Sequence, residues 1–183
     1  THNMTFPVSG TGSAGMEFCM VNLVEPGDEV VVCINGVFGM RMAEVAERCG
    51  AKVIKVEAPW GQIIEASQVA KALEGRKPKL VGLVHAETST GALTPVEEIS
   101  ELAHQAGALM LLDTVTSLAG CEVNVDKWQI DAVYSGTQKC LSCPPGLSPV
   151  SLSDKALEVA QSRRERVQSW YLDVNLLNGY WGT

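Results

Sequence analysis

Short apolar runs alternate with longer amphipathic stretches along most of the chain. The apolar runs are rich in Val, Ile and Leu, as in strands buried on both faces, and two of the intervening helical patterns end at Gly50 and Gly107. This alternation predicts an α/β fold built from βα units around a mostly parallel sheet. We predict strands at 29–34, 51–56, 80–84, 108–112, 130–134 and 147–152, and helices at 13–24, 39–48, 66–74, 96–105 and 154–167.

The composition indicates one globular domain. With 183 residues, 46% of them hydrophobic and 19% charged, the chain can form a single sizeable core. A net charge of −7 argues against a nucleic-acid partner, and the run Arg163, Arg164 and Arg166 is expected on the solvated face of the last helix. Because no stretch has the length of a membrane span or the pattern of a signal peptide, we expect no membrane association and a cytoplasmic or other soluble intracellular location.

The six cysteines mostly lie within apolar runs, where a reduced cysteine serves as a small buried side chain. We therefore expect free thiols. Cys140 and Cys143 have the spacing of a redox motif or of half a zinc site, but the chain offers no second pair of ligands at a suitable spacing. No metal site is predicted.

Polar residues that directly follow apolar strands are the candidates for chemistry, because ligands of open parallel sheets bind beyond the carboxyl ends of the strands. Four groups of residues meet this description. They are Ser9–Gly15, Asn35–Phe38, His85–Gly91 together with Asp113–Val115, and Ser135–Lys139.

The first of these segments is glycine-rich, and two interpretations of it remain open. Gly10, Gly12 and Gly15 have the spacing of a dinucleotide fingerprint, which would indicate a nicotinamide-binding oxidoreductase domain. Pro7 in the preceding strand and Asn35 in place of an acidic residue after the next strand weaken that match.

The alternative is a site for a single phosphate at the start of a helix. Glycines permit close approach of the backbone, and Thr11, Gly12 and Ser13 would offer amides and hydroxyls to the anion.

Asp113, Lys139 and Phe38 are the other candidates for a functional site. Asp113 follows five consecutive apolar residues, so its carboxylate should be buried, either as a local turn residue or as the partner of a cationic ligand. Lys139 precedes a mostly uncharged loop and, unless it is a surface lysine, suits imine chemistry. Together with a phosphate site, these residues predict a pyridoxal cofactor. Asp113 would keep the pyridine nitrogen protonated, Lys139 would form the Schiff base and move protons, and Phe38 would cover the ring.

The chain resembles the class V aminotransferases of pyridoxal-phosphate fold type I, and within them the alanine-glyoxylate, serine-glyoxylate and serine-pyruvate group. The resemblance covers almost the whole chain. It is carried by Ser9–Ser13, Glu25–Asp28, Asn35–Gly39, His85–Gly91, Leu112–Ser117, Tyr134–Lys139 and Pro144–Gly146.

The resemblance implies a role for each matching residue. Thr11, Gly12, Ser13 and Gln138 would contact the phosphate of pyridoxal 5'-phosphate (PLP). Thr88 would bond near the ring hydroxyl, and Val115 would lie against the ring opposite the aromatic side chain. Relatives often carry Trp at position 38 and His at position 13, and Cys140 is unusual for the group.

The resemblance also implies a fold, a reaction and a partner. Residues 1–183 would form a three-layer α/β/α sandwich, the PLP-binding large domain, without the N-terminal segment and C-terminal small domain of the family. The reaction would be ping-pong transfer of an amino group from alanine or serine to glyoxylate or pyruvate by a homodimer. We expect this chain to be a fragment with little turnover of its own.

Three other functions remain possible at this stage. A phosphonate transaminase or a cysteine desulfurase would use similar cofactor residues, although the mobile-loop cysteine of desulfurases is not recognisable here. A nicotinamide-dependent oxidoreductase domain would rest on the glycine spacing alone. A non-catalytic interaction domain is disfavoured because Asp113, Gln138 and Lys139 are all present.

Overall fold

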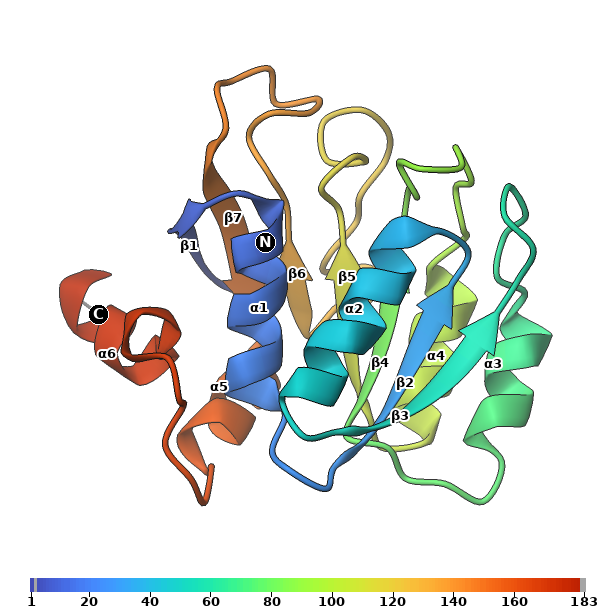
Figure 1. Cartoon of the computed structure of the whole chain (residues 1–183), viewed down its shortest axis with the longest axis horizontal. Helices are drawn as coiled ribbons and strands as arrows, with labels where there is room; N and C mark the ends of the chain where they lie inside the picture. The colour runs from blue at the N-terminus through green and yellow to red at the C-terminus, as the bar shows by residue number, and fades with distance from the viewer. Residues whose placement is uncertain (2, 182–183) are drawn as a thin grey trace.

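Seven strands form one mixed sheet in the computed structural model, which describes residues 1 and 3–181, the last by its backbone only. The strand order is β1-β7-β6-β5-β4-β2-β3, and β7 alone runs against the others (Figure 1). The strands are β1 (Met4–Gly10), β2 (Glu29–Ile34), β3 (Lys52–Glu57), β4 (Leu80–Val84), β5 (Leu109–Asp113), β6 (Ala132–Tyr134) and β7 (Gly146–Leu152).

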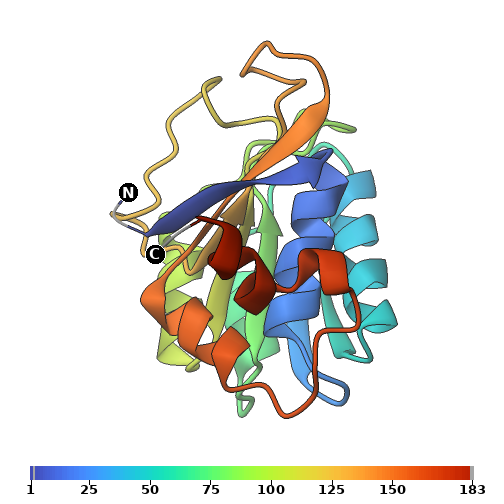
Figure 2. The same cartoon turned by 90° about the vertical axis from the view of Figure 1, so that its left-hand side faces the viewer.

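Helices cover both faces of the sheet, which gives the expected three layers. Figure 2 shows α1 and α2 on one side of the strands and α4 on the other. The short elements η1 and α6 pack beside α1 and α5. The helices are α1 (Gly12–Leu23), α2 (Val37–Arg48), α3 (Ala66–Leu73), α4 (Glu97–Gln105), α5 (Asp154–Gln161), η1 (Trp170–Leu172) and α6 (Val174–Trp181).

The central strands are apolar throughout because both of their faces are buried. Along β2, Val30 and Val32 join the core under α1 and α2, whereas Val31 and Cys33 join the core under α3 and α4. Since successive side chains of a strand point to opposite faces, two cores need a continuous apolar run. This is the run that the sequence shows.

Most of the predicted elements lie within two residues of the observed ones, and the strands at 29–34 and 80–84 agree in full. The last predicted helix is wrong beyond Gln161, where α5 ends. The guanidinium of Arg163 donates instead to the carbonyls of Asn22 and Val24, at 3.3 and 2.7 Å. Arg163 therefore satisfies carbonyls at the C-terminal end of α1 and is not part of a helix face.

Three elements, β1, η1 and α6, were not predicted. β1 contains Pro7 and lies at the edge of the sheet, where it pairs with β7 alone and Pro7 stands opposite Pro149. An edge strand tolerates proline because only one of its sides carries ladder hydrogen bonds.

No helix in the described residues is long and apolar enough to cross a membrane.

Candidate functional site

The predicted site residues gather at one edge of the sheet, where the parallel strands end and α1 begins (upper edge in Figure 1). Loops leave β2, β4, β5 and β6 at this edge. Several polar side chains at these strand ends and in the loops are buried, in contrast to the apolar strands beneath them. They are Asn35, His85, Glu87, Asp113, Thr114 and Ser135.

Asp113, the last residue of β5, is a buried carboxylate bound only by neutral donors. Its exposed fraction is 3%. Tyr134 donates its hydroxyl to Oδ2 at 2.7 Å, and the amide of Val115 donates to Oδ1 at 2.8 Å. Burial raises the pKa of Asp113 from 3.8 to about 6, although both hydrogen bonds lower it. No described residue forms an ion pair with it.

Lys139 lies at the same edge as Asp113. In the paired strands β5 and β6, Asp113 is in register with Tyr134, and the half-buried Lys139 follows five residues later. The thiol of Cys140 lies 3.2 Å from the carbonyl oxygen of Thr116, so the loop after β6 contacts the loop after β5. The lysine and the buried carboxylate are therefore brought to neighbouring loops.

The start of α1 has the features of an anion site. No side chain caps its amides, and its first turn contains no acidic residue. A Cβ atom built on Gly136 would lie 2.8 Å from Gln138 Oε1 and 3.3 Å from the amide nitrogen of Gly12. Gln138 and Gly12 thus approach the same point. A Cβ atom on Gly12 would overlap the side chain of Val115, so only glycine fits there.

Contacts between loops connect the remaining predicted residues. The hydroxyls of Thr88 and Thr116 form a hydrogen bond. The guanidinium of Arg41 lies 5.0 Å from the centre of the Phe38 ring and donates to the Ser13 hydroxyl at 3.2 Å. Phe38 on α2 is therefore tied to the start of α1.

Arg41 places a positive charge beside the start of α1 and was not among the residues predicted from the sequence. Its charge lowers the pKa of Asp113, so it lies within electrostatic reach of that carboxylate. Its spacing of three residues from Phe38 on one helix was the signal that could have identified it.

Glu87 is a second buried carboxylate at this edge, and its role was also missed. Its exposed fraction is 1%. Oε2 accepts the amides of Phe38 and Gly39 at 3.1 and 3.2 Å, and Oε1 accepts the amide and hydroxyl of Ser89 at 3.1 and 2.7 Å. The carboxylate thus occupies the start of α2, whereas the start of α1 is left open.

Three cysteines contradict the expected burial. Cys19 and Cys33 are buried and Cys49 is half-buried, but Cys121, Cys140 and Cys143 are exposed in the loops of the candidate site. Within the described residues, no three His, Cys, Asp or Glu side chains come together as metal ligands.

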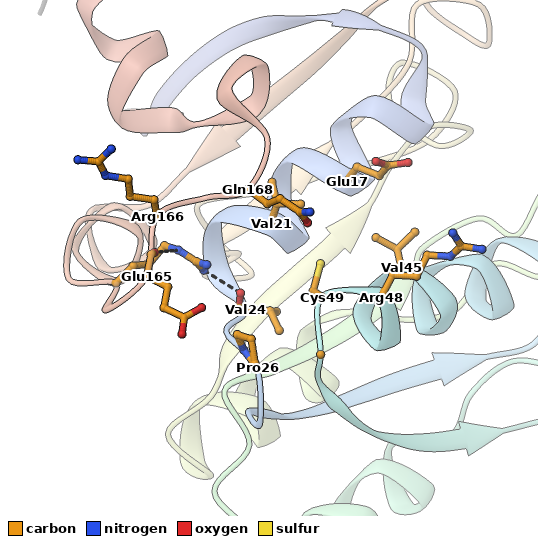
Figure 3. A pocket seen from close by; sticks show the side chains of 12 residues that line it. Glu17, Val21, Val24, Pro26, Val45, Arg48, Cys49, Glu165, Arg166 and Gln168 are labelled. Carbon is orange, nitrogen blue, oxygen red and sulfur yellow. Dashed lines mark hydrogen bonds between the residues drawn. The ribbon is translucent and has the colours of Figure 1, made fainter.

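A separate cavity of about 640 Å³ lies along the C-terminal half of α1 (Figure 3). Val21, Val24 and Cys49 contribute to its wall, together with arginines from α2 and from the segment after α5. None of the predicted site residues lines it. It is therefore distinct from the candidate site.

The fold also argues against a nicotinamide site at the glycine turn. α1 connects β1 at the sheet edge with β2, and four other strands lie between these two. The dinucleotide fingerprint belongs to a βαβ unit of neighbouring parallel strands, which is not the arrangement here.

Solved structures with this fold identify its class as that of the aminotransferases. The chain superimposes on an alanine-glyoxylate aminotransferase from Nostoc sp. with a TM-score of 0.97 and 48% identity, covering 100% of this chain and 49% of that one. A ureidoglycine-glyoxylate aminotransferase from Bacillus subtilis gives a TM-score of 0.97 and 39% identity, with 100% and 48% covered.

The family follows from the sequence comparison. Residues 2–166 match the model of the family described as aminotransferase class-V, so the chain belongs to the class-V aminotransferases. Alanine-glyoxylate aminotransferase of Rattus norvegicus is 42% identical over 179 residues, which cover 98% of this chain and 43% of the rat protein. The chain thus spans about half the length of the curated relatives it matches.

Proposed function

We propose that this chain forms the cofactor-binding part of a PLP-dependent aminotransferase that transfers an amino group from alanine or serine to glyoxylate or pyruvate. The observation that carries the proposal is the buried Asp113 carboxylate, which lies on the same sheet edge as Lys139, accepts hydrogen bonds from neutral donors and forms no ion pair within the described residues. A protonated pyridine nitrogen would supply the missing positive charge.

The residues present suit the parts of PLP. The phosphate would bind the open start of α1 through Thr11, Gly12 and Ser13, with Gln138 beside them and Arg41 supplying a positive charge. Lys139 would hold the aldehyde carbon covalently. Asp113 would bind the ring nitrogen, Phe38 and Val115 would enclose the ring, and Thr88 would bond near its hydroxyl.

When bound, PLP would act as an electron sink for the α-carbon of the amino acid. The chain would keep this sink effective by holding a proton on the ring nitrogen at Asp113. Tyr134 and the Val115 amide fix the Asp113 carboxylate in position for that task. The amine of Lys139 would carry a proton to and from the α-carbon as a general base and acid.

Glyoxylate is the acceptor best supported by the relatives. The rat and Bacillus subtilis relatives both carry glyoxylate in their names, whereas the first is named for alanine and the second for ureidoglycine. These names support a small amino acid as the donor. We also propose a homodimer as the assembly, as the family resemblance implies.

The experiment that tests this function uses the complete product of the gene that encodes the chain. We expect a yellow protein with PLP, and borohydride reduction should attach the cofactor to Lys139, as peptide mass spectrometry would show. Alanine or serine should then convert the spectrum, and glyoxylate should restore it. A cofactor label on another lysine, or binding of NADH in place of PLP, would contradict the proposal.

A further inference from the structure

We propose that Glu87 is a positioning residue whose carboxylate sets Phe38 and Thr88 against the cofactor ring. This inference rests on the proposed function. It adds a role for a residue that would not itself touch PLP. The starting observation is that one buried side chain, in the loop after β4, binds both the start of α2 and Ser89 of its own loop.

The first of these contacts fixes the start of α2. The amides of Phe38 and Gly39 both donate to Oε2 of Glu87, across 49 and 48 residues of sequence. A carboxylate suits this place because the first amides of a helix have no partners within the helix and carry partial positive charge. The backbone of Phe38 is thereby held, and the direction of its ring with it.

The second contact fixes the loop after β4. Oε1 of Glu87 accepts both the amide and the hydroxyl of Ser89, and that hydroxyl also accepts the amide of Val37 at 3.0 Å. Thr88 lies between the two bonded residues, so its hydroxyl has a fixed direction toward Thr116. One carboxylate therefore connects Phe38, on α2, with Thr88, on the loop.

The Glu87 side chain packs closely against the backbone at the start of α2. A Cβ atom built on Gly36 would overlap Cγ of Glu87 and would lie 2.5 Å from the Ser89 hydroxyl. The backbone at Gly36 is extended, with φ at 173°, so space and not conformation requires the glycine. The start of α2 is shaped around the Glu87 side chain.

Glu25 provides a matched control. Its Oε1 also accepts two backbone amides, those of Arg164 and Glu165 at 3.0 and 3.1 Å. These contacts lie beyond the C-terminal end of α1, at the opposite end of that helix from the glycine turn. Loss of either carboxylate should weaken a local structure, but only Glu87 should affect the cofactor.

The test compares E87A and E25A in the complete gene product. We expect E87A to weaken PLP binding about fivefold and to reduce the circular dichroism of the bound cofactor, because a loosened ring contact is worth about 1 kcal/mol. E25A should leave both within about twofold, a margin of roughly 0.4 kcal/mol. Without cofactor, the amides of Phe38 and Gly39 should exchange with solvent faster in E87A than in the parent protein.

A second comparison asks whether Glu87 acts through Phe38. In an F38A background, E87A should weaken PLP binding by only about twofold, because the Phe38 contact is already absent and only the effect on Thr88 remains. If E87A does not fold, E87D keeps the charge, withdraws the carboxylate by one methylene and should give about a threefold loss on the same reasoning.

Two outcomes would overturn the inference. One is equal PLP affinity and dichroism in E87A and E25A. The other is that E87A weakens PLP binding as much in the F38A background as it does in the parent protein. Failure of the proposed function would look different, because the parent protein itself would then lack the cofactor spectrum. The hydrogen exchange of Phe38 and Gly39 would still report whether Glu87 fixes α2.

Discussion

Two buried aspartates lie at opposite ends of neighbouring strands, and their surroundings differ. Asp131 directly precedes β6, and three donors converge on it: His104 Nε2 at 2.8 Å, the Met110 amide at 2.9 Å and the Ser153 hydroxyl at 2.9 Å. Asp113 ends β5 with two neutral donors and a pKa raised to about 6. At the amino end of the strands the carboxylate completes the fold, whereas at the carboxyl end it is left short of positive charge, as a ligand site requires.

The largest expected effect comes from removing Lys139, which lies near Asp113 at the carboxyl ends of the strands. K139A should lower transamination at least about 1000-fold, because the covalent attachment and the proton carrier are lost together. Turnover of alanine and glyoxylate, and borohydride labelling, would measure it.

K155A is the matched control for the opposite end of the sheet, where Lys155 donates to the Ala108 carbonyl at 3.2 Å. It should keep the cofactor label. Retention of the borohydride label in K139A would show that the cofactor is not attached to Lys139. The two ends of the sheet would then not differ in the way described.

D113N should have opposite effects on activity and on stability. Activity should fall about 100-fold, since a neutral amide cannot hold the ring nitrogen as a cation. Without cofactor, however, the variant should be more stable above pH 6. Its amide oxygen can still accept the Val115 amide, and its amino group can donate to the Tyr134 hydroxyl.

The sign of the stability change follows from the raised pKa of Asp113. The folded protein keeps this proton up to about pH 6, whereas an unfolded chain releases it near pH 3.8, so the parent protein loses stability between these values. A pKa shift from 3.8 to about 6 corresponds to roughly 3 kcal/mol of unfolding free energy. Urea denaturation of both proteins at pH 4 and pH 7 would measure it, and equal stability at pH 7 would refute the expectation.

D131N should lower the stability of the folded protein, whereas D113N should raise it. His104 and the Met110 amide both donate to Oδ2 and Ser153 donates to Oδ1, so an asparagine, with a single acceptor oxygen and no charge, cannot accept all three bonds as the carboxylate does. The free energy of unfolding should fall by about 2 kcal/mol at pH 7, with PLP affinity unchanged. Parallel urea denaturation and PLP titration would check this, and a stabilised D131N would show that the two ends of the sheet do not differ as described.

The smallest expected effect concerns the ring contact. F38A should weaken PLP binding about tenfold, the value of one aromatic contact. F38W should bind at least as well as the parent protein, because a larger ring covers the same face. Titration of the cofactor spectrum would measure both. If F38A bound PLP more tightly than the parent protein, the Phe38 ring would not lie against the cofactor.

Much of the fold was predictable because local patterns carry it. The strands β2 and β4 were predicted to the residue, since continuous apolar runs bounded by polar residues have few alternatives. The edge strand β1 was missed because Pro7 argues against a strand unless its edge position is known. The last helix was extended too far because its pattern does not show that Arg163 binds α1.

The candidate site was predictable in part for a similar reason. Asp113 and Lys139 could be recognised because each follows a strand, and parallel strands end at one edge. The contacts of Arg41 with Ser13 and of Glu87 with Phe38 could not be recognised, because these partners lie 28 and 49 residues apart in sequence. No local pattern encodes which loop will meet which helix.

By itself, the sequence determined the alternation of strands and helices, the edge at which polar residues gather, and the residue types suited to a PLP-like ligand. These depend on periodicity and on residue chemistry, which are local properties. The tertiary structure alone decided that Asp113 forms no ion pair within the described residues, that three donors bind Asp131, and that Glu87 binds the amides at the start of α2 while no side chain caps α1. Those properties depend on how burial and hydrogen bonds are distributed among distant segments, and only the packed chain fixes that distribution.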